Sequence, residues 1–298
     1  MDVKLEVFLS VVQHGNFSRA AEELNMSQPA VSQQIKSLEN ELGVKLLDRN
    51  TKMVSPTRAG EIVHHYGQQI SAIYGMMQRT LDDLRELITG SLIVGASYTF
   101  GEYILPHIMA DFCRSHPEVR PSIHISNTEN VAEMVSMNAI DLGVVEGDVD
   151  LPGISVSELM SDRMVIIASP RYSCEDADKV DVQELSSVTW VLRERGSGTR
   201  TAADALLKSA GIEPAFVMEF SSTQAIKESV AAGLGLSILS ELTVQEEIQQ
   251  RKICQIPLEQ LQVDSMRKFY LLHREVGFEP KVVEAFREFL MLAAGQLE

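Results

Sequence analysis

The sequence predicts an α/β fold in which a small helical domain and one long helix precede a domain built on a parallel sheet. Three observations predict it: short helical segments over residues 1–59, one heptad pattern over residues 60–89, and β-branched runs that alternate with amphipathic stretches over residues 90–298. The chain has 298 residues, of which 45% are hydrophobic and 23% charged. This composition excludes a disordered, collagen-like or small disulfide-stapled protein.

The first 59 residues are predicted to form three helices. The apolar face of the first comprises Leu5, Phe8, Leu9 and Val12, and Gly15 ends that helix. Ser18 is the expected N-cap of the second helix, whose inner face comprises Ala20, Ala21 and Leu24. Ser27 is the expected N-cap of the third, with Pro29 in its first turn. The core side of this third helix comprises Val31, Ile35, Leu38 and Leu42.

The opposite face of the third helix is small and polar, which suits a helix that reads bases. The residues expected to contact DNA from this helix are Ser27, Gln28, Pro29, Ala30, Ser32, Gln33 and Lys36. Glutamine and serine pair with base edges, and a small apolar residue lies against a thymine methyl group. Two short helices joined by a short turn are the form of a helix-turn-helix DNA reader.

A basic segment follows the third helix. Between Lys45 and Arg58 the chain carries four cations against one anion, Asp48, so this segment would contact phosphates as a wing. The expected contacts are Arg49, Lys52, Thr57 and Arg58. On pattern alone, a three-helix bundle with solvated polar faces stays open as the alternative.

The net charge of −16, taken whole, argues against a phosphate-rich partner. The acidity lies outside the helical domain, however. Residues 1–60 carry seven basic and seven acidic side chains, whereas residues 90–298 carry seventeen and thirty-one. DNA affinity is therefore expected to be local to the first sixty residues.

One long helix is predicted over residues 60–89. Its seam, which begins at the residue before it, comprises Ala59, Val63, Tyr66, Ile70, Ile73, Met77, Thr80, Leu84 and Leu87. About thirty helical residues span roughly 45 Å, which is too long for burial against one small domain. Because the opposite face is polar, we expect two chains to pair along the seam. A core helix of a single large domain stays the alternative.

Residues 90–298 alternate between strands and helices. The expected strands are Leu92–Ala96, Ser122–Ile125, Leu142–Val145, Met164–Ala168, Trp190–Leu192, Phe216–Glu219, Leu236–Ile238 and Phe269–Leu272. The expected helices include Ile104–Arg114, Val131–Met137, Arg200–Ala210, Gln224–Ala232 and Lys281–Leu292. Two α/β lobes fit this length better than one.

Hydroxyl, amide and charged residues follow several of these strands, where ligands gather in α/β sheets. The candidates are Ser97, Tyr98, Thr99, Asn127, Thr128, Glu146, Arg193, Gly196, Ser197, Gly198, Thr199, Arg200 and Thr223. The two glycines allow backbone N–H groups to converge, and Arg200 adds positive charge. Together they predict an anion pocket. Each group alone is better explained by helix caps and tight turns.

The sequence contains no recognisable catalytic or cofactor motif. GxSxG, the Walker loop, HExxH and DxDxDG do not occur, so we expect neither an enzyme nor a metal or cofactor. Cys113, Cys174 and Cys254 lie far apart and are expected to be reduced, inert thiols. The charged N-terminus and the lack of a long apolar run predict a cytoplasmic chain without a membrane span.

Residues 2–60 closely resemble the LysR-type transcriptional regulators. The resemblance is carried by Gly15-Asn16-Phe17-Ser18-Arg19-Ala20-Ala21, Ser27-Gln28-Pro29-Ala30-Val31-Ser32-Gln33, Leu42-Gly43 and Thr57-Arg58-Ala59-Gly60. Leu47 stands where the family often has phenylalanine. The resemblance implies a winged helix-turn-helix at 1–59, a dimerisation helix at 60–89 and an effector-binding domain at 90–298. That domain would resemble periplasmic binding proteins, with lobe I at 90–161 plus 267–298 and lobe II at 162–266.

The implied partners are double-stranded operator or promoter DNA, one to three further copies of the chain, a small anionic effector and RNA polymerase. Three segments look like the subgroup containing CysL, YeiE and CbbR: Ser97-Tyr98-Thr99, Asn127-Thr128-Glu129 and Arg193-Glu194-Arg195-Gly196-Ser197-Gly198-Thr199-Arg200. These regulators serve sulfur assimilation, sulfite response or carbon fixation and sense small anions. Sulfite or a related sulfur oxyanion is the first expected effector. An α/β enzyme acting on an anionic metabolite and a ligand-independent regulator are the alternatives.

Overall fold

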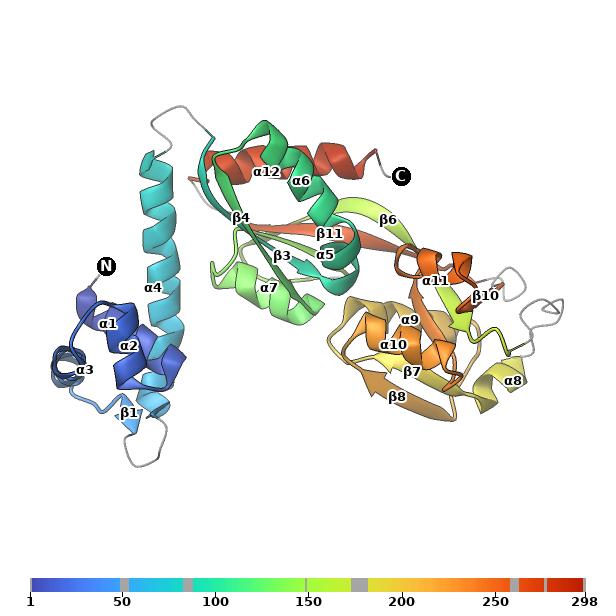
Figure 1. Ribbon diagram of the computed structural model, residues 1–298, viewed down its shortest axis with the longest axis horizontal. Coiled ribbons are helices and arrows are strands. Elements are labelled where there is room, and N and C mark those ends of the chain that lie inside the picture. Colours follow the sequence, from blue (N-terminus) through green and yellow to red (C-terminus); the bar gives the residue numbers. More distant parts are fainter. Residues whose placement is uncertain are drawn as a thin grey trace. The chain divides into compact units, whose positions relative to one another are not determined.

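The computed structural model of the chain (Figure 1) describes residues 2–48, 54–82, 88–147, 149–172, 182–257, 263–275 and 278–296. It divides into two compact units, the first made mainly of residues 1–85 and the second mainly of residues 86–298. Five residues singled out from the sequence lie outside the described residues: Arg49, Lys52, Leu84, Leu87 and Cys174.

The first unit is a helix-turn-helix with a small wing. Its elements are α1 (Val3–His14), α2 (Phe17–Glu23), α3 (Gln28–Leu42), β1 (Leu47–Asp48), β2 (Ser55–Pro56) and α4 (Arg58–Asp82). The turn between α2 and α3 passes through Asn25, whose φ of 52° is the left-handed conformation that asparagine tolerates. Strands β1 and β2 pair antiparallel, with Leu47 opposite Pro56. The predicted third helix and its Ser27 cap are confirmed.

Two local predictions for this unit are wrong. Asn16, not Ser18, caps α2, because its side-chain oxygen accepts the N–H groups of both Ser18 and Arg19. Leu42 is 46% exposed instead of buried, because α3 ends there, and Leu46 and Leu47 enter the core in its place.

Gly60 allows α4 to pack closely against Leu46, the residue before the strand β1. A Cβ atom at this position would lie 2.0 Å from the carbonyl oxygen of Leu46, far inside van der Waals contact. Thr57 fixes the same junction, because its hydroxyl donates to the Lys45 carbonyl oxygen and accepts the N–H of Gly60. The wing and the long helix are therefore positioned by one small contact region.

Glu39 is a buried carboxylate that joins α3 to the wing. Its Oε1 accepts the N–H of Leu46 at 2.9 Å, and its Oε2 pairs with the largely exposed Lys45 at 3.0 Å. Burial by itself would raise the pKa of Glu39, but the hydrogen bonds from the Leu46 N–H, Lys45 and the Leu47 N–H hold that pKa below its ordinary value. The charged form therefore stabilises this unit.

Replacing Glu39 by glutamine is expected to destabilise the first unit by about 2 kcal/mol at neutral pH, the scale of buried hydrogen bonds to a charged group. Because the folded-state pKa lies below the unfolded value, this contribution is present above pH 4.5 and is lost as the pH falls through the lowered folded pKa. Hydrogen exchange of α3 amides in the full chain should therefore differ between parent and Glu39→Gln at pH 7 and converge in acid. Glu22→Gln, an exposed change on α2, serves as the control. A constant difference across pH would contradict the assignment.

Helix α4 divides its apolar residues between two directions. Ala59 and Val63 pack on the core of the first unit, and Gly67 admits Leu5 and Leu9 of α1 to within about 3 Å of where a Cβ would stand. A second set stays exposed and forms one stripe along the helix: Ile62, Tyr66, Ile70, Ile73, Met77 and Leu81. We call this set the α4 stripe. The predicted seam is thus shared between the unit's own core and an outward face.

The second unit is built on a mixed sheet with strand order β10-β6-β11-β5-β3-β4, beside which β9 pairs with β6. Its strands are β3 (Gly90–Ser97), β4 (Val119–Ser126), β5 (Leu142–Glu146), β6 (Ile154–Ala168), β9 (Ser237–Ser240), β10 (Cys254–Ile256) and β11 (Met266–Arg274). A separate parallel pair joins β7 (Thr189–Arg193) to β8 (Phe216–Phe220). The expected strands are present. A wholly parallel sheet is wrong, however, because β11 runs antiparallel to both β5 and β6.

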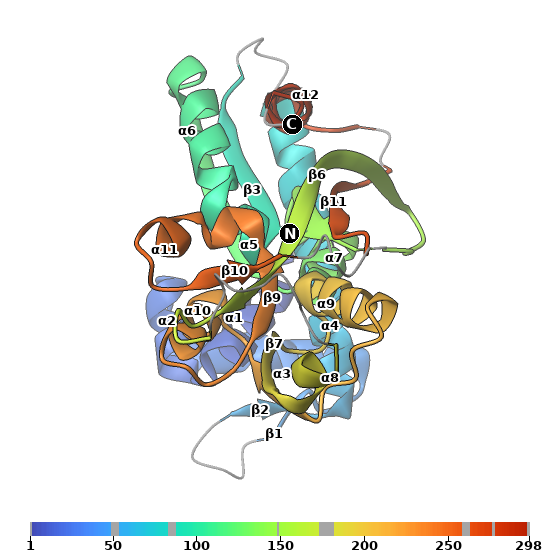
Figure 2. The same ribbon diagram turned by 90° about the vertical axis from the view of Figure 1, so that its right-hand side faces the viewer.

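Two groups of helices cover the sheet and define two lobes, both visible in Figures 1 and 2. The first lobe carries α5 (Tyr98–Tyr103), α6 (Leu105–Ser115), α7 (Thr128–Ser136) and α12 (Lys281–Ala294). The second carries α8 (Val182–Ser187), α9 (Gly198–Ser209), α10 (Thr223–Ala231), the 3-10 turn η3 (Glu241–Thr243) and α11 (Gln245–Gln249). Strand β6 pairs with β11 up to Arg163 and with β9 from Met164, so it runs through both lobes. The lobe and domain boundaries themselves stay a prediction.

The cysteines differ in state. Cys113 is free, whereas Cys254 is disulfide-bonded, so the expectation of reduced thiols is wrong for Cys254. Within the described ranges, no helix is long and apolar enough to cross a membrane. The same ranges contain no cluster of three His, Cys, Asp or Glu side chains that is suited to a metal ion.

Candidate functional site

The outward face of α3 carries the residues expected to contact DNA. Gln28, Pro29, Gln33 and Lys36 are exposed, while Val31, Ile35 and Leu38 are buried on the opposite side. The Gln28 amide donates to the Ser32 hydroxyl at 3.1 Å, so these two side chains form one polar group on that face. Arg58 is also exposed, and its ion pair with exposed Glu61 is of the weak surface kind.

Most of the predicted anion-pocket residues lie at the carboxyl ends of strands in the second unit. Ser97 ends β3, Glu146 ends β5, and Arg193 ends β7, while Ser197 and Ser222 are the N-caps of α9 and α10. The predicted residues buried there are Ser97, Thr99, Thr128, Glu146, Arg193, Ser197, Thr199 and Thr223. Strand ends of both lobes thus contribute polar side chains to the interior.

Arg267 of β11 joins these strand ends. Its Nη1 donates to Thr199 Oγ1 of the second lobe at 2.9 Å, and its Nη2 donates to Thr99 Oγ1 of the first lobe at 3.1 Å. Nη1 also lies 3.3 Å from Glu146 Oε1. Its Nε donates to Asp162 Oδ2 at 2.6 Å. The guanidinium therefore pairs with two buried carboxylates and one hydroxyl from each lobe.

The loop before α9 packs directly against the end of β5. Thr128 Oγ1 donates to the Glu146 carbonyl oxygen at 3.0 Å and accepts the N–H of Gly198 at 3.2 Å. A Cβ at Gly198 would lie 2.2 Å from that same carbonyl oxygen, so a larger residue would push the loop away. The Thr199 hydroxyl then reaches Glu146 Oε1 at 3.2 Å. Glycine at position 198 is what permits this approach.

A second polar group surrounds Arg193. Its guanidinium forms two 2.7 Å bonds with Glu194, donates to Thr223 Oγ1 at 3.3 Å, and lies 4.4 Å from the centre of the Tyr98 ring. Because Tyr98 belongs to the first lobe, this stacking also links the lobes. Asn127 instead caps α7 by accepting the N–H of Asn130, and Gly196 lies beside the Glu129 carboxylate.

Arg200 does not point into either group. Its guanidinium bonds Asp204, the Arg193 carbonyl oxygen and Glu219. The cation at the centre of the strand ends is Arg267, which the sequence pattern did not identify.

Lys227 forms a further link between the lobes. Its ammonium donates to Tyr103 of α5 at 3.0 Å, to the Thr243 carbonyl oxygen at 2.9 Å and to Glu247 at 2.6 Å. Burial alone would lower the pKa of Lys227, but the hydrogen bonds to Glu247 and Tyr103 and the Coulomb attraction of Glu247 hold that pKa above its ordinary value. It therefore stays a buried cation at neutral pH.

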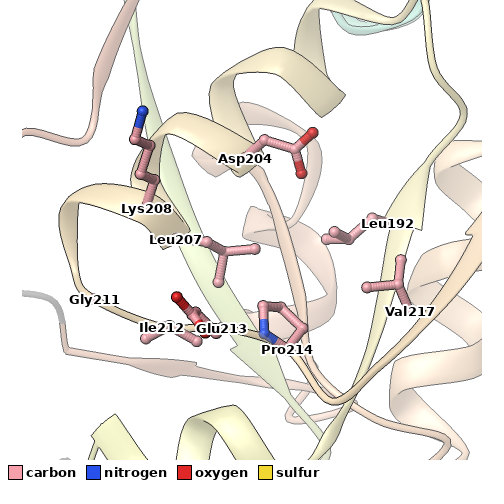
Figure 3. Close-up of a pocket in the computed structure, with 9 residues that line it drawn as sticks. All are labelled: Leu192, Asp204, Leu207, Lys208, Gly211, Ile212, Glu213, Pro214 and Val217. Atoms are coloured by element: carbon pink, nitrogen blue, oxygen red, sulfur yellow. The ribbon is translucent and has the colours of Figure 1, made fainter.

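Two cavities lie close to these elements. One of about 370 Å³ includes Gly147, Gly198 and Arg267 in its wall, next to the strand ends. The other, of about 350 Å³, lies beside α9, where Leu207, Leu192 and Pro214 surround it (Figure 3). None of the nine residues lining the second cavity belongs to the predicted set.

Comparison with known families decides the class of the protein. The family described as bacterial regulatory helix-turn-helix protein, lysR family, matches residues 3–61, and the LysR substrate binding domain matches residues 85–294. The chain belongs to the LysR family. It is a DNA-binding transcriptional regulator with an effector-binding domain, and its relatives are regulators rather than enzymes.

Curated relatives and solved structures agree with this assignment. The LysR-type regulator is 34% identical to the HTH-type transcriptional regulator CysL of Bacillus subtilis (strain 168), over 95% of this chain and 94% of CysL. It is 32% identical to the RuBisCO operon transcriptional regulator of Allochromatium vinosum, over 99% and 96% of the two chains. Full-length CbnR in complex with its target DNA shares the fold with a TM-score of 0.73 and 23% identity, over 97% and 98% of the chains.

Proposed function

We propose that this LysR-type regulator binds an interrupted inverted repeat as a dimer or tetramer in the cytoplasm, and that a small anion bound between the lobes changes the arrangement of its DNA readers. The observation that carries the effector step is the group of buried hydroxyls from both lobes around Arg267. A ligand that binds these strand ends would change the free energy of lobe closure, which would alter the spacing or angle of paired readers.

Sulfite or a related sulfur oxyanion is the first candidate effector, supported by the similarity to CysL. An anion of carbon fixation is the second, supported by the similar sequence identity to the RuBisCO operon regulator.

Thermal shifts of the full chain with sulfite, sulfate, thiosulfate, phosphate, acetylserine and sugar phosphates separate these classes. A shift that Thr199→Ala and Ser97→Ala both reduce would support the site. Unchanged DNA occupancy and bending in footprints with a tightly bound ligand would exclude the coupling.

The exposed face of α3 and the nearby Arg58 are expected to make different kinds of DNA contact. Gln33→Ala is expected to relax base preference at one position of each half-site by about 1–3 kcal/mol, because glutamine reads base edges. Arg58→Ala is expected to weaken binding about equally on all sequences, because a phosphate contact carries no sequence information. It should also reduce the slope of log affinity against log salt concentration by about one, because one phosphate contact is lost. Gel shifts on an operator series at several salt concentrations measure both. Unchanged affinity and preference in Gln33→Ala would mean that α3 faces DNA differently.

A further inference from the structure

Two buried polar atoms at the strand ends have no hydrogen-bond partner among the described residues: Ser97 Oγ and Glu146 Oε2. Both residues are only 2% exposed. Ser97 also occupies the N-cap position of α5 without forming a side-chain cap bond to any described residue. Folded proteins leave few such atoms, because each loses its hydration without regaining a hydrogen bond. These two atoms therefore mark where a ligand would bond.

The two residues end neighbouring strands of the sheet. Strands β3 and β5 run parallel with Ala96 opposite Val144, so their carboxyl ends, at Ser97 and Glu146, lie at the same edge of the sheet. The other oxygen of Glu146, Oε1, is already used by Thr199 and Arg267. Only Oε2 is therefore left to accept a further hydrogen bond.

The polar groups near these strand ends are unequal in hydrogen-bond character. Arg267 and the N–H groups that begin α9 can only donate, and the hydroxyls of Ser97, Thr99 and Ser197 can do either. A carboxylate oxygen can only accept, and it repels a fully deprotonated oxyanion. An anion that carries its own hydrogen satisfies both kinds of group. It receives bonds from the donors and gives one to Glu146 Oε2.

We infer that the effector site selects a small oxyanion that carries its own O–H donor, and that Glu146 Oε2 is the acceptor of that donor. This inference rests on the proposed anion response. Among sulfur oxyanions it selects hydrogen sulfite over sulfate. Among organic acids it selects those with a hydroxyl beside the acid group.

Matched anions test the inference by calorimetric titration of the full-length protein at pH 7. The pairs are phosphate against sulfate, glycolate against acetate, and hydroxymethanesulfonate against methanesulfonate; in each, only the first carries an O–H donor. We expect the donor-bearing member of every pair that binds to do so about tenfold tighter or more, which corresponds to one buried hydrogen bond left unmade by its partner.

Glu146→Gln is expected to abolish or reverse this preference, because an amide N–H₂ in place of Oε2 donates instead of accepting. Glu133→Gln, an exposed change on α7, is the control and should keep the parent ratio. Ser97→Ala leaves the Glu146–Arg267 pair intact and should weaken donor-bearing anions several-fold, which provides a second variant if Glu146→Gln folds poorly.

The outcomes separate the inference from the proposed function. Anions that bind the parent without a donor preference, or a preference that survives in folded Glu146→Gln, would overturn the inference and leave the anion response standing. If no anion of the panel binds the parent, the anion response fails and the inference fails with it.

Discussion

Replacing Arg267 by alanine is expected to lower the free energy of unfolding of the α/β unit by about 3–5 kcal/mol, the cost of removing one partner of a buried ion pair. The change would leave Asp162 and Glu146 as buried carboxylates without their cation. It would also remove the donors to Thr99 and Thr199, and with them the bonds that tie β11 to both lobes. A loss of this size is a large share of the stability of an ordinary domain.

Urea unfolding followed by Trp190 fluorescence measures this effect, because this residue is the chain's single tryptophan and is fully buried in the second lobe. Arg163→Ala, an exposed arginine on β6, is the matched control and should change stability by about 0.5 kcal/mol or less. Adding Asp162→Asn to the Arg267→Ala variant should recover part of the loss, because one uncompensated charge is removed. If the free energy of unfolding of Arg267→Ala lies within 1 kcal/mol of the parent value, the Arg267 network has no net stabilising role.

The sequence predicted the elements whose pattern is local. Val31, Ile35 and Leu38 lie on one face of a regular helix, so burial of that face follows from spacing alone. The strands of the α/β unit were equally visible, because each is a short apolar run. Ser97 and Glu146 were placed at strand ends for the same reason. The direction of β11 was not predictable in this way, since nothing in Phe269–Leu272 encodes whether the strand runs parallel or antiparallel.

Arg267 was not identified from the sequence, for a physical reason. A single arginine at the start of an apolar strand has no repeating pattern, and its partners Asp162, Glu146 and Thr99 are distant in sequence. One signal was present, however. Arg267, Phe269 and Leu271 alternate toward the same buried side of β11, so an arginine occupies a core position. Arg200 was predicted instead as the cation of the anion pocket, because it belongs to a glycine- and hydroxyl-rich segment. Its ion pair with Asp204, four residues later on the same helix, holds its guanidinium away from that segment.

The heptad pattern also could not predict which apolar residues of α4 face the unit's own core and which face outward. Val63 and Ile62 are both apolar neighbours on the helix, and a heptad count cannot tell which of them faces a second chain. Packing against α1 decides it, because Gly67 brings Leu5 and Leu9 close to the side that includes Val63. The α4 stripe is what is left for a partner. Such a run of exposed apolar side chains is typical of an interaction surface.

The double change Ile70→Glu and Ile73→Glu is expected to break the pairing of two chains along α4 and so to halve the mass of the oligomer in solution. Both side chains lie in the middle of the α4 stripe and are about half exposed in the single chain. A carboxylate there would have to be buried without a partner when two stripes pair. Light scattering after size-exclusion chromatography gives the mass directly.

The same double variant is expected to lose about 100-fold or more in operator affinity, because paired readers gain from the effective concentration of the second half-site. The control is Gln68→Glu with Gln78→Glu, which adds the same charge to exposed positions of α4 outside the stripe. If the mass falls while operator affinity is kept, the stripe assembles the protein without supplying the second reader. If the mass does not change, the chains pair elsewhere and the α4 stripe has another partner. The predicted pairing of DNA readers along α4 requires both losses together.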